Sequence, residues 1–302
     1  MLTIKDLSLE EYMLPGNGAC PGCAAVASLR IALKVLGPRT ILTVPACCVS
    51  VIQGYYPRTP VRISLLNTAF ASAAASASGI AAAFEMKGRQ GINIVCWAGD
   101  GGTADIGIQS LSGAAERNEN FIYVCYDNEA YMNTGTQRSG ATPRGATTTT
   151  TVLGKKERKK NMPDIMVAHD IPYVATACTA FPLDFATKIK KAMGINGLKY
   201  IHLLSPCPPG WRFPSEKTVE VGKLAVVTGA WILYEYNSGT YTLTGPSKGL
   251  VRRENRKPVS EYLKLQGRYD KVSPETAQSL QEDVDAYWEK FLRRLTPGNP
   301  TQ

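Results

Sequence analysis

The chain has 302 residues, a formal net charge of +9 and a hydrophobic content of 44%, which is the composition of a globular protein with one large α/β domain or a domain with an appendage. The basic residues are spread out and no zinc-finger or RNP-type motif is present, which argues against a nucleic-acid-binding protein. The charged N-terminus and the absence of a long apolar run exclude a secretion signal and a membrane span, so we expect a cytoplasmic protein.

The first half of the chain alternates strand and helix patterns. After a polar arm, the periodicity of apolar residues predicts a helix over 24–35, strands over 40–44 and 61–66, and an Ala-rich buried helix over 69–84. A strand over 92–97 then stops at Gly99-Asp100-Gly101-Gly102, and a helical pattern and a second strand over 121–126 follow. Strand, glycine turn, helix and strand form a βαβ unit, whose sheet is expected to be parallel.

The second half continues the pattern and then changes. It predicts a helix ending at His169, a helix over 183–192, and strands over 173–176 and 200–204. Beyond Pro214 come a β-hairpin around 237–239 and an amphipathic helix over 274–295. We therefore predict a domain over 1–214 and an arm over 215–302 that packs on a partner.

Three groups of polar residues are expected to be structural. Lys155 to Lys160 is predicted to be a solvated loop, with a docking face for an acidic partner as the alternative. His169 and His202 are predicted to cap or pack, because no acid or nucleophile motif lies beside either. Cys96, Cys125 and Cys178 lie in apolar strand patterns and are predicted to be core residues.

The turn from Gly99 to Gly102 is typical of a phosphate-binding site. Its glycines let the backbone approach a ligand without clashes from Cβ atoms. The helix after them directs free N–H groups and the positive end of its dipole at the same place. Asp100 would repel a phosphate unless a cation lay between them, and Mg²⁺ commonly takes one or two protein ligands together with phosphate oxygens. Asn128, at the end of the adjoining strand, is placed to add an amide oxygen.

Cys20 and Cys23 form a CxxC pair at the start of a helix. Because we expect no secretion signal, the eight cysteines do not indicate a disulfide framework. A redox dithiol usually follows a strand, which residues 14–19 do not form, and a zinc site needs a second close pair, for which adjacent Cys47 and Cys48 are poorly suited. An iron–sulfur cluster tolerates wide spacing of its four thiolates. The residues alone leave these three sites open.

The segment GDGGTADIGIQSLSGAAER, followed by YVCYDNEAYMNTG and QRSGATP, resembles the β subunit of thiamine-diphosphate-dependent 2-oxoacid:ferredoxin oxidoreductases. The resemblance implies an α/β thiamine-diphosphate-binding fold, with a mostly parallel sheet and helices on both faces. It also implies that Asp100, Asn128 and the Ala130 carbonyl hold Mg²⁺ on the diphosphate. Asn133 would then face the reacting carbon, and the other cofactor-binding residues would be Gly99, Gly101, Gly102 and Phe70.

The same resemblance implies a [4Fe-4S] cluster. In the family a CxxC pair is followed by a cysteine roughly 25 residues later and by a distant Pro-Cys-Pro. Here Cys48 follows Cys23 by 48 − 23 = 25 residues, and Cys207 lies between two prolines. The implied ligands are Cys20, Cys23, Cys48 and Cys207, with Cys47 as the alternative to Cys48.

The implied reaction is the oxidative decarboxylation of a 2-oxoacid, with electrons passed singly through the cluster to ferredoxin. An α-type subunit would supply the glutamate that activates the cofactor's pyrimidine ring, and γ- and δ-type chains or domains would complete the enzyme. A pyruvate member typically has Asn-Ala-Phe-Glu-Asn before its alanine run, whereas this chain has Thr68-Ala69-Phe70-Ala71-Ser72, with Arg58 and Arg62 upstream. Because negative charge is reduced there, we expect oxalate, oxidised without CoA. The alternatives are CoA-dependent pyruvate oxidation, a non-redox thiamine carboligase or decarboxylase, and a zinc-stabilised binding module.

Overall fold

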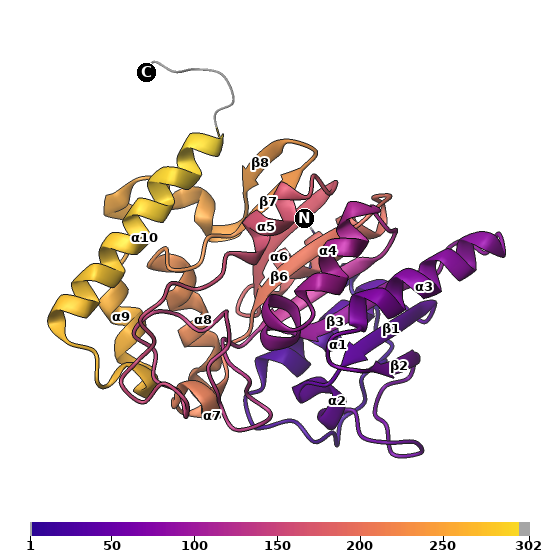
Figure 1. Cartoon of the computed structure of the whole chain (residues 1–302), viewed down its shortest axis with the longest axis horizontal. Coiled ribbons are helices and arrows are strands. Elements are labelled where there is room, and N and C mark those ends of the chain that lie inside the picture. Colours follow the sequence, from indigo (N-terminus) through magenta and orange to yellow (C-terminus); the bar gives the residue numbers. More distant parts are fainter. Residues whose placement is uncertain (1, 296–302) are drawn as a thin grey trace.

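The computed structural model describes residues 2–295, which form one eight-stranded sheet covered by helices on both faces (Figure 1). The strand order is β2-β1-β3-β4-β6-β5-β7-β8. Strands β1 to β6 are parallel to one another, and β7 and β8 add an antiparallel hairpin at one edge. The strands are β1 Thr40–Pro45, β2 Ser64–Thr68, β3 Asn93–Gly99, β4 Ile122–Asp127, β5 Tyr173–Cys178, β6 Lys199–Leu204, β7 Tyr234–Asn237 and β8 Thr240–Leu243.

Every predicted strand is present, and the expected parallel sheet with helices on both faces is confirmed. Helices α1 and α6 pack together on one face, and α3, α4 and α5 cover the other. The helices are α1 Ala24–Leu36, α2 Cys48–Ile52, α3 Ala73–Met86, α4 Ile108–Glu116, α5 Met162–Ala168, α6 Pro182–Met193, α7 Pro208–Trp211, α8 Thr218–Val227, α9 Val259–Lys264 and α10 Pro274–Leu295.

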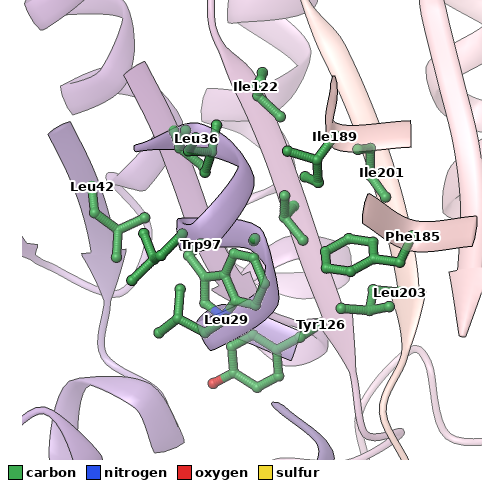
Figure 2. Packing of buried hydrophobic residues seen from close by; sticks show 14 of the residues in the cluster. Leu29, Leu36, Leu42, Trp97, Ile122, Tyr126, Phe185, Ile189, Ile201 and Leu203 are labelled. Atoms are coloured by element: carbon green, nitrogen blue, oxygen red, sulfur yellow. The ribbon is translucent and has the colours of Figure 1, made fainter. Parts of the chain in front are cut away.

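The core on the α1 and α6 face is built around aromatic rings (Figure 2). Trp97 of β3 stacks on Tyr126 of β4 at 6.3 Å between ring centroids and meets the edge of Phe185 of α6 at 6.4 Å. Because successive strand residues point to opposite faces, Cys96 beside Trp97 lies in the other core with Cys125. Both thiols are buried, as is Cys178, so their predicted core positions are confirmed.

The Ala-rich helix differs from its prediction. It begins at Ala73 rather than at residue 69, and only one side of it is buried. Its final turns, with exposed Glu85 and Met86, extend past the sheet, as Figure 1 shows. The small side chains allow close packing on β3 over the first half only, so the expectation of a wholly buried helix is wrong.

The helix after the glycine turn also begins differently from its prediction. Gly101–Asp105 forms a π-helical turn, and regular α4 starts only at Ile108. A π turn is a wider coil that frequently occurs at functional sites. The segment closest to Asp100 is therefore a widened turn and not the first turn of a regular helix.

The C-terminal part both extends the sheet and covers its end. The predicted hairpin forms as β7 and β8, and the predicted helix over 274–295 forms as α10. Trp288 and Phe291 of α10 are fully buried in a third cluster within this chain. The division at residue 214 and the packing of the arm on a partner remain predictions. None of the helices between residues 2 and 295 has the length and apolar character needed to cross a membrane.

Candidate functional site

The predicted site residues lie in loops that follow parallel strands. Cys48 follows β1, Phe70 follows β2, Asp100 follows β3, Asn128 follows β4 and Cys207 follows β6. The carboxyl ends of β3, β4 and β6 lie side by side, because Gly99 of β3 pairs with Tyr126 of β4, and Asp127 of β4 pairs with Leu204 of β6. Parallel strands end at the same edge of a sheet, and ligands bind there where the strand order reverses, which here lies between β1 and β3. Topology therefore gathers residues that are far apart in the sequence.

Asp100 is a buried carboxylate without a positively charged partner. It accepts a hydrogen bond of 2.5 Å from the Ser139 hydroxyl and forms no ion pair within residues 2–295. Burial raises its pKa well above the usual range for aspartate, and the charge of Asp127 raises it further. A buried carboxylate in this state favours binding of a cation.

Asn128 and Ala130 present two further polar groups to Asp100. One terminal atom of the Asn128 amide lies 2.9 Å from Asp100 Oδ1 and 3.0 Å from the Ala130 carbonyl oxygen. With nitrogen at that position, the amide donates to both oxygens. With oxygen there, that atom lies 2.9 Å from the Asp100 oxygen and 3.0 Å from the Ala130 oxygen. Both distances are close to the spacing of adjacent ligands around an octahedral Mg²⁺ with bonds of about 2.1 Å. The predicted magnesium ligands are thus brought together, and their chemistry and spacing fit the ion.

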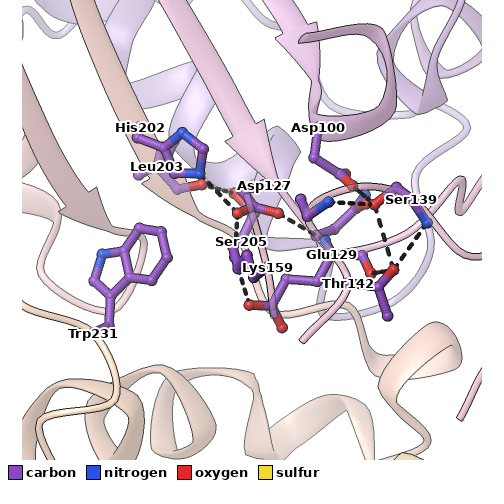
Figure 3. A network of polar contacts seen from close by, with 12 residues as sticks. Asp100, Asp127, Glu129, Ser139, Thr142, Lys159, His202, Leu203, Ser205 and Trp231 are labelled. Carbon is purple, nitrogen blue, oxygen red and sulfur yellow. Dashed lines mark hydrogen bonds and ion pairs between the residues drawn. The ribbon is translucent and has the colours of Figure 1, made fainter. Parts of the chain in front are cut away.

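The turn that carries Asn128 is held by two cationic side chains, of which Figure 3 shows Lys159. Lys159 Nζ lies 2.5 Å from Asp127 Oδ2 and 2.7 Å from Glu129 Oε1. Arg268 Nη2 lies 2.6 Å from Glu129 Oε2, an ion pair whose angle does not suit a hydrogen bond. Glu129 has φ +67°, in the left-handed region that is uncommon for such a residue. These contacts hold Glu129 in the conformation that directs its two neighbours at Asp100, and they leave Asp100 as the carboxyl group of this cluster without a cationic partner.

His202 contributes to the same network from β6. Its Nε2 lies 2.8 Å from Asp127 Oδ2, and its Nδ1 lies 2.5 Å from the Tyr200 hydroxyl. Burial lowers the pKa of His202, so a neutral ring that donates to Asp127 and accepts from Tyr200 fits both contacts. The prediction that His202 has no neighbouring acid is wrong, because cross-strand pairing of β4 and β6 brings Asp127 to it. Its predicted packing position is confirmed, with Trp231 stacked on the ring at 5.5 Å.

Sequence reasoning missed the loop over 139–142 and the lysines that support it. The Thr142 hydroxyl donates to the Glu129 carbonyl at 2.7 Å, while the Ser139 hydroxyl donates to Asp100. Lys155 is buried and donates to the Thr142 carbonyl at 2.7 Å. The prediction of a solvated basic loop is therefore wrong for Lys155 and Lys159. A run of basic residues in the sequence does not indicate which of their side chains point inward. The segment QRSGATP was part of the resemblance, but no role was assigned to Ser139 or Thr142.

The glycines after Asp100 are covered by two aromatic rings. A Cβ atom at Gly101 would collide with the ring of Tyr131, and one at Gly102 would lie 3.1 Å from Phe70 Cε2. The two rings meet edge to face at 6.0 Å. Phe70 is thus brought to the turn as expected. Asn133 is exposed in the turn between Tyr131 and Gln137, and its predicted role remains a prediction.

The four predicted cluster cysteines lie in one neighbourhood at the same edge of the sheet. Burial raises the pKa of Cys48 to about 12, and the negative charges of Cys207, Cys47 and Cys23 act in the same direction. Burial likewise raises the pKa of Cys207 to about 12, with contributions from Cys23 and Cys20. Cys23 and Cys207 directly precede α1 and α7, and Cys48 opens α2. Helix N-termini favour anionic sulfur, which fits an iron–sulfur cluster.

The spacing of these cysteines does not suit a single metal ion. Within residues 2–295 no three His, Cys, Asp or Glu side chains are grouped closely enough to hold one. Four cysteine thiolates from distant parts of the chain are a donor set that an iron–sulfur cluster takes, so the residues present fit such a cluster.

Cys47 and Cys48 point to different surroundings. The Cys47 thiol interacts with the Tyr126 hydroxyl and with the backbone of Ser50, Val49 and Gly99. The Cys48 thiol instead has Cys207 and Cys23 among its charged neighbours. This arrangement favours Cys48 as the sulfur directed at the other cysteines.

Comparisons with known proteins show to which family the chain is similar. Residues 46–203 match the family described as thiamine pyrophosphate enzyme, C-terminal TPP binding domain. The pyruvate synthase subunit PorB of Methanothermobacter thermautotrophicus is 51% identical over 92% of this chain and 96% of its own length. The ketoisovalerate oxidoreductase subunit VorB of Pyrococcus furiosus is 46% identical over 95% and 94%. The solved 2-oxoglutarate:ferredoxin oxidoreductase of Magnetococcus marinus has the same fold, with a TM-score of 0.57, 21% identity, and coverage of 98% of this chain and 97% of that chain.

Proposed function

Because this chain belongs to the thiamine pyrophosphate enzymes, and among them to the β subunits of the 2-oxoacid:ferredoxin oxidoreductases, we propose that it holds magnesium, diphosphate and an iron–sulfur cluster for the oxidation of a 2-oxo monocarboxylic acid. The observation that carries the proposal is the convergence of Asp100, Asn128 and the Ala130 carbonyl at one edge of the sheet, beside four gathered cysteines.

Asp100, Asn128 and Ala130 would hold Mg²⁺ through a carboxylate, an amide oxygen and a carbonyl oxygen, which are ligand types that Mg²⁺ takes together with phosphate oxygens. Ser139 orients Asp100 through its hydroxyl, and Lys159 fixes the turn on either side of Asn128. Gly101, Gly102 and Phe70 shape the wall beside the diphosphate. Asn133 orients the substrate at the reacting end. Thiamine diphosphate, when bound, supplies the carbon nucleophile through which a 2-oxoacid loses CO₂.

Cys20, Cys23, Cys48 and Cys207 would hold a [4Fe-4S] cluster, which would supply one-electron transfer toward ferredoxin. Burial raises the pKa of Cys48 and of Cys207, so these two thiols are protonated without iron and would lose their protons when a cluster binds. Cluster assembly is therefore coupled to the release of protons from this part of the chain.

The proposed substrate is pyruvate or a branched-chain 2-oxoacid, with CoA as acyl acceptor. The proposal is supported by the names of the relatives, which specify pyruvate and ketoisovalerate. Oxalate, which was expected from Arg58 and Arg62, has no such support. Both arginines are exposed next to the edge strand β2 and form no ion pair within residues 2–295.

The proposed partners are an α-type subunit that supplies the pyrimidine-activating glutamate, γ- and δ-type chains or domains, and ferredoxin. The relatives are named as subunits, which supports a hetero-oligomer. Glu129, the one glutamate described at the turn beside Asp100, is already paired with Lys159 and Arg268.

The test is anaerobic purification of the chain with its partner subunits, followed by iron, magnesium and thiamine analysis. We expect a brown protein with about four irons bound to this chain for one cluster. Dye and ferredoxin reduction should then be measured with pyruvate, 2-oxoisovalerate and oxalate, each with and without CoA. CoA-dependent activity with a 2-oxo monocarboxylate is expected.

Other outcomes identify the alternatives. Activity with oxalate alone, independent of CoA, would overturn the proposed substrate. Thiamine diphosphate without iron would indicate a non-redox thiamine enzyme, and zinc without thiamine would indicate a binding module.

A further inference from the structure

Trp211 joins the two predicted cofactor sites. It is fully buried at the end of α7, four residues after Cys207. Its indole Nε1–H donates to the Asn128 carbonyl at 2.7 Å, and its backbone N–H donates to the Cys207 carbonyl at 2.8 Å. One residue therefore contacts the main chain of a proposed magnesium ligand and that of a proposed cluster ligand.

Two further contacts join the same segments. The Arg268 guanidinium lies 3.8 Å from the centroid of the Trp211 ring and also pairs with Glu129, next to Asn128. The thioether of Met132 packs on Gly210, where an added Cβ atom would collide with it and would lie 3.4 Å from Cys207 Sγ. The turn over 207–211 and the loop over 127–132 are thus fastened at three places.

We propose that Trp211 is a positioning residue that fixes the Asn128 loop relative to the Cys207 turn, so that the diphosphate site and the cluster site are held in one geometry. This inference rests on the proposed function. It adds that a shift of one site displaces the other, and that the hydrogen bond from the Trp211 Nε1–H to the Asn128 carbonyl is a principal contact through which this happens.

The indole is suited to this role for a physical reason. Its N–H is a donor only, and it serves a carbonyl in a position without access to water. If the donor is removed, a buried carbonyl loses its partner, which costs more than the net value of an ordinary hydrogen bond. The loop would then relax to recover a partner, and relaxation there moves Asn128 and Ala130.

The experiment compares Trp211→Phe with Trp288→Phe in the anaerobic holoenzyme. Trp288 is a matched control, because it is equally buried and its Nε1–H also donates to a backbone carbonyl, that of Gly229 at 2.9 Å, within the α10 cluster. Both variants keep an aromatic ring and lose one buried donor, so their losses of thermal stability should be similar. The two readouts are the Kd for thiamine diphosphate at fixed Mg²⁺, by calorimetry, and the EPR spectrum of the reduced cluster.

Trp211→Phe is expected to raise the Kd about tenfold, the effect of losing about 1.4 kcal/mol, and to change the EPR line shape. Trp288→Phe should change neither. Unchanged Kd and spectrum in Trp211→Phe, or equal changes in both variants, would overturn the inference. A wild-type enzyme that retains neither thiamine diphosphate nor iron would instead overturn the proposed function, and this inference with it.

Discussion

Lys159 places one positive charge between two buried carboxylates, Asp127 and Glu129, which flank Asn128 in the sequence. Burial alone would raise the pKa of Asp127, but the charge of Lys159 and the hydrogen bond from His202 hold it below the usual range. The two carboxylates and the cations Lys159 and Arg268 balance one another. Asp100 is the carboxyl group left without a cation, so it is the group to which an added cation would bind.

Lys159→Met is expected to weaken the binding of magnesium and thiamine diphosphate by at least tenfold. The substitution leaves Asp127 without its cation, and breaking a buried ion pair costs about 3 kcal/mol of folding free energy. The measurements are the Kd for thiamine diphosphate at fixed Mg²⁺ and the free energy of unfolding in urea.

Lys188→Met is the matched control for this prediction. Lys188 is also a buried lysine in an ion pair, 2.5 Å from Asp184 within α6. It should show a similar loss of stability with unchanged affinity. Equal affinity losses in both variants would show that the effect of Lys159 is only structural.

Lys199 gives a pH dependence whose sign is fixed by burial. Burial lowers its pKa from 10.5 to about 8, and Nζ donates to the Asn120 side chain at 2.6 Å. At a pH between about 8 and 10.5, Lys199 is largely deprotonated in the folded chain but still protonated in the unfolded chain. The unfolded chain therefore binds more protons, and the contribution of Lys199 to the free energy of unfolding rises as the pH increases through this range.

Lys199→Met removes this dependence. The variant should be more stable than the wild type at pH 7, and the difference should narrow as the pH approaches 10, when measured as the free energy of unfolding. A constant difference across that range would contradict the lowered pKa.

At the scale of elements, the spacing of apolar residues predicts helices and strands correctly where the apolar residues form the buried side of the element. The limits of α10 agree with its amphipathic pattern, and the strands from β3 to β6 agree with their apolar runs. The π turn over 101–105 was not predictable, because it depends on contacts of Gly101 and Gly102 with rings from distant loops. The inward lysines were missed because their carboxylate partners lie in other elements.

Helix α10 should contribute substantially to stability through its buried side. Phe291 is fully buried, with its ring 4.6 Å from that of Tyr234. Phe291→Ala is expected to lower the free energy of unfolding by about 3–5 kcal/mol, because it leaves a cavity. Leu153, which is 91% exposed, is the control, and Leu153→Ala should change stability by less than about 0.5 kcal/mol. Chemical denaturation measures both, and a loss below 1 kcal/mol for Phe291→Ala would contradict the packing.

For the whole molecule, the sequence predicts those site residues that come directly after the ends of strands. Asp100, Asn128 and the four cysteines were placed together from spacing and resemblance, because parallel topology makes carboxyl ends coincide. The supporting residues Ser139, Lys159 and Trp211 were not, since their contacts depend on how long loops fold back over that edge.

The isolated chain is expected to be inactive. If the pyrimidine-activating glutamate comes from a partner, this chain with thiamine diphosphate, Mg²⁺ and ferredoxin should reduce no dye, and addition of the α-type subunit should restore activity. Turnover by the chain alone would contradict the division of the site between subunits.

The two edges of the sheet differ in their contacts. Helix α10 packs against the edge strand β8, whereas β2 ends the sheet with Leu66 45% exposed, and Tyr55 and Tyr56 in the preceding loop are 87% and 92% exposed. An uncovered strand edge is a template on which other strands can pair. Chains synthesised in excess of their partners are therefore expected to aggregate through β2. Balanced production of the subunits in one cell is expected to keep them in solution.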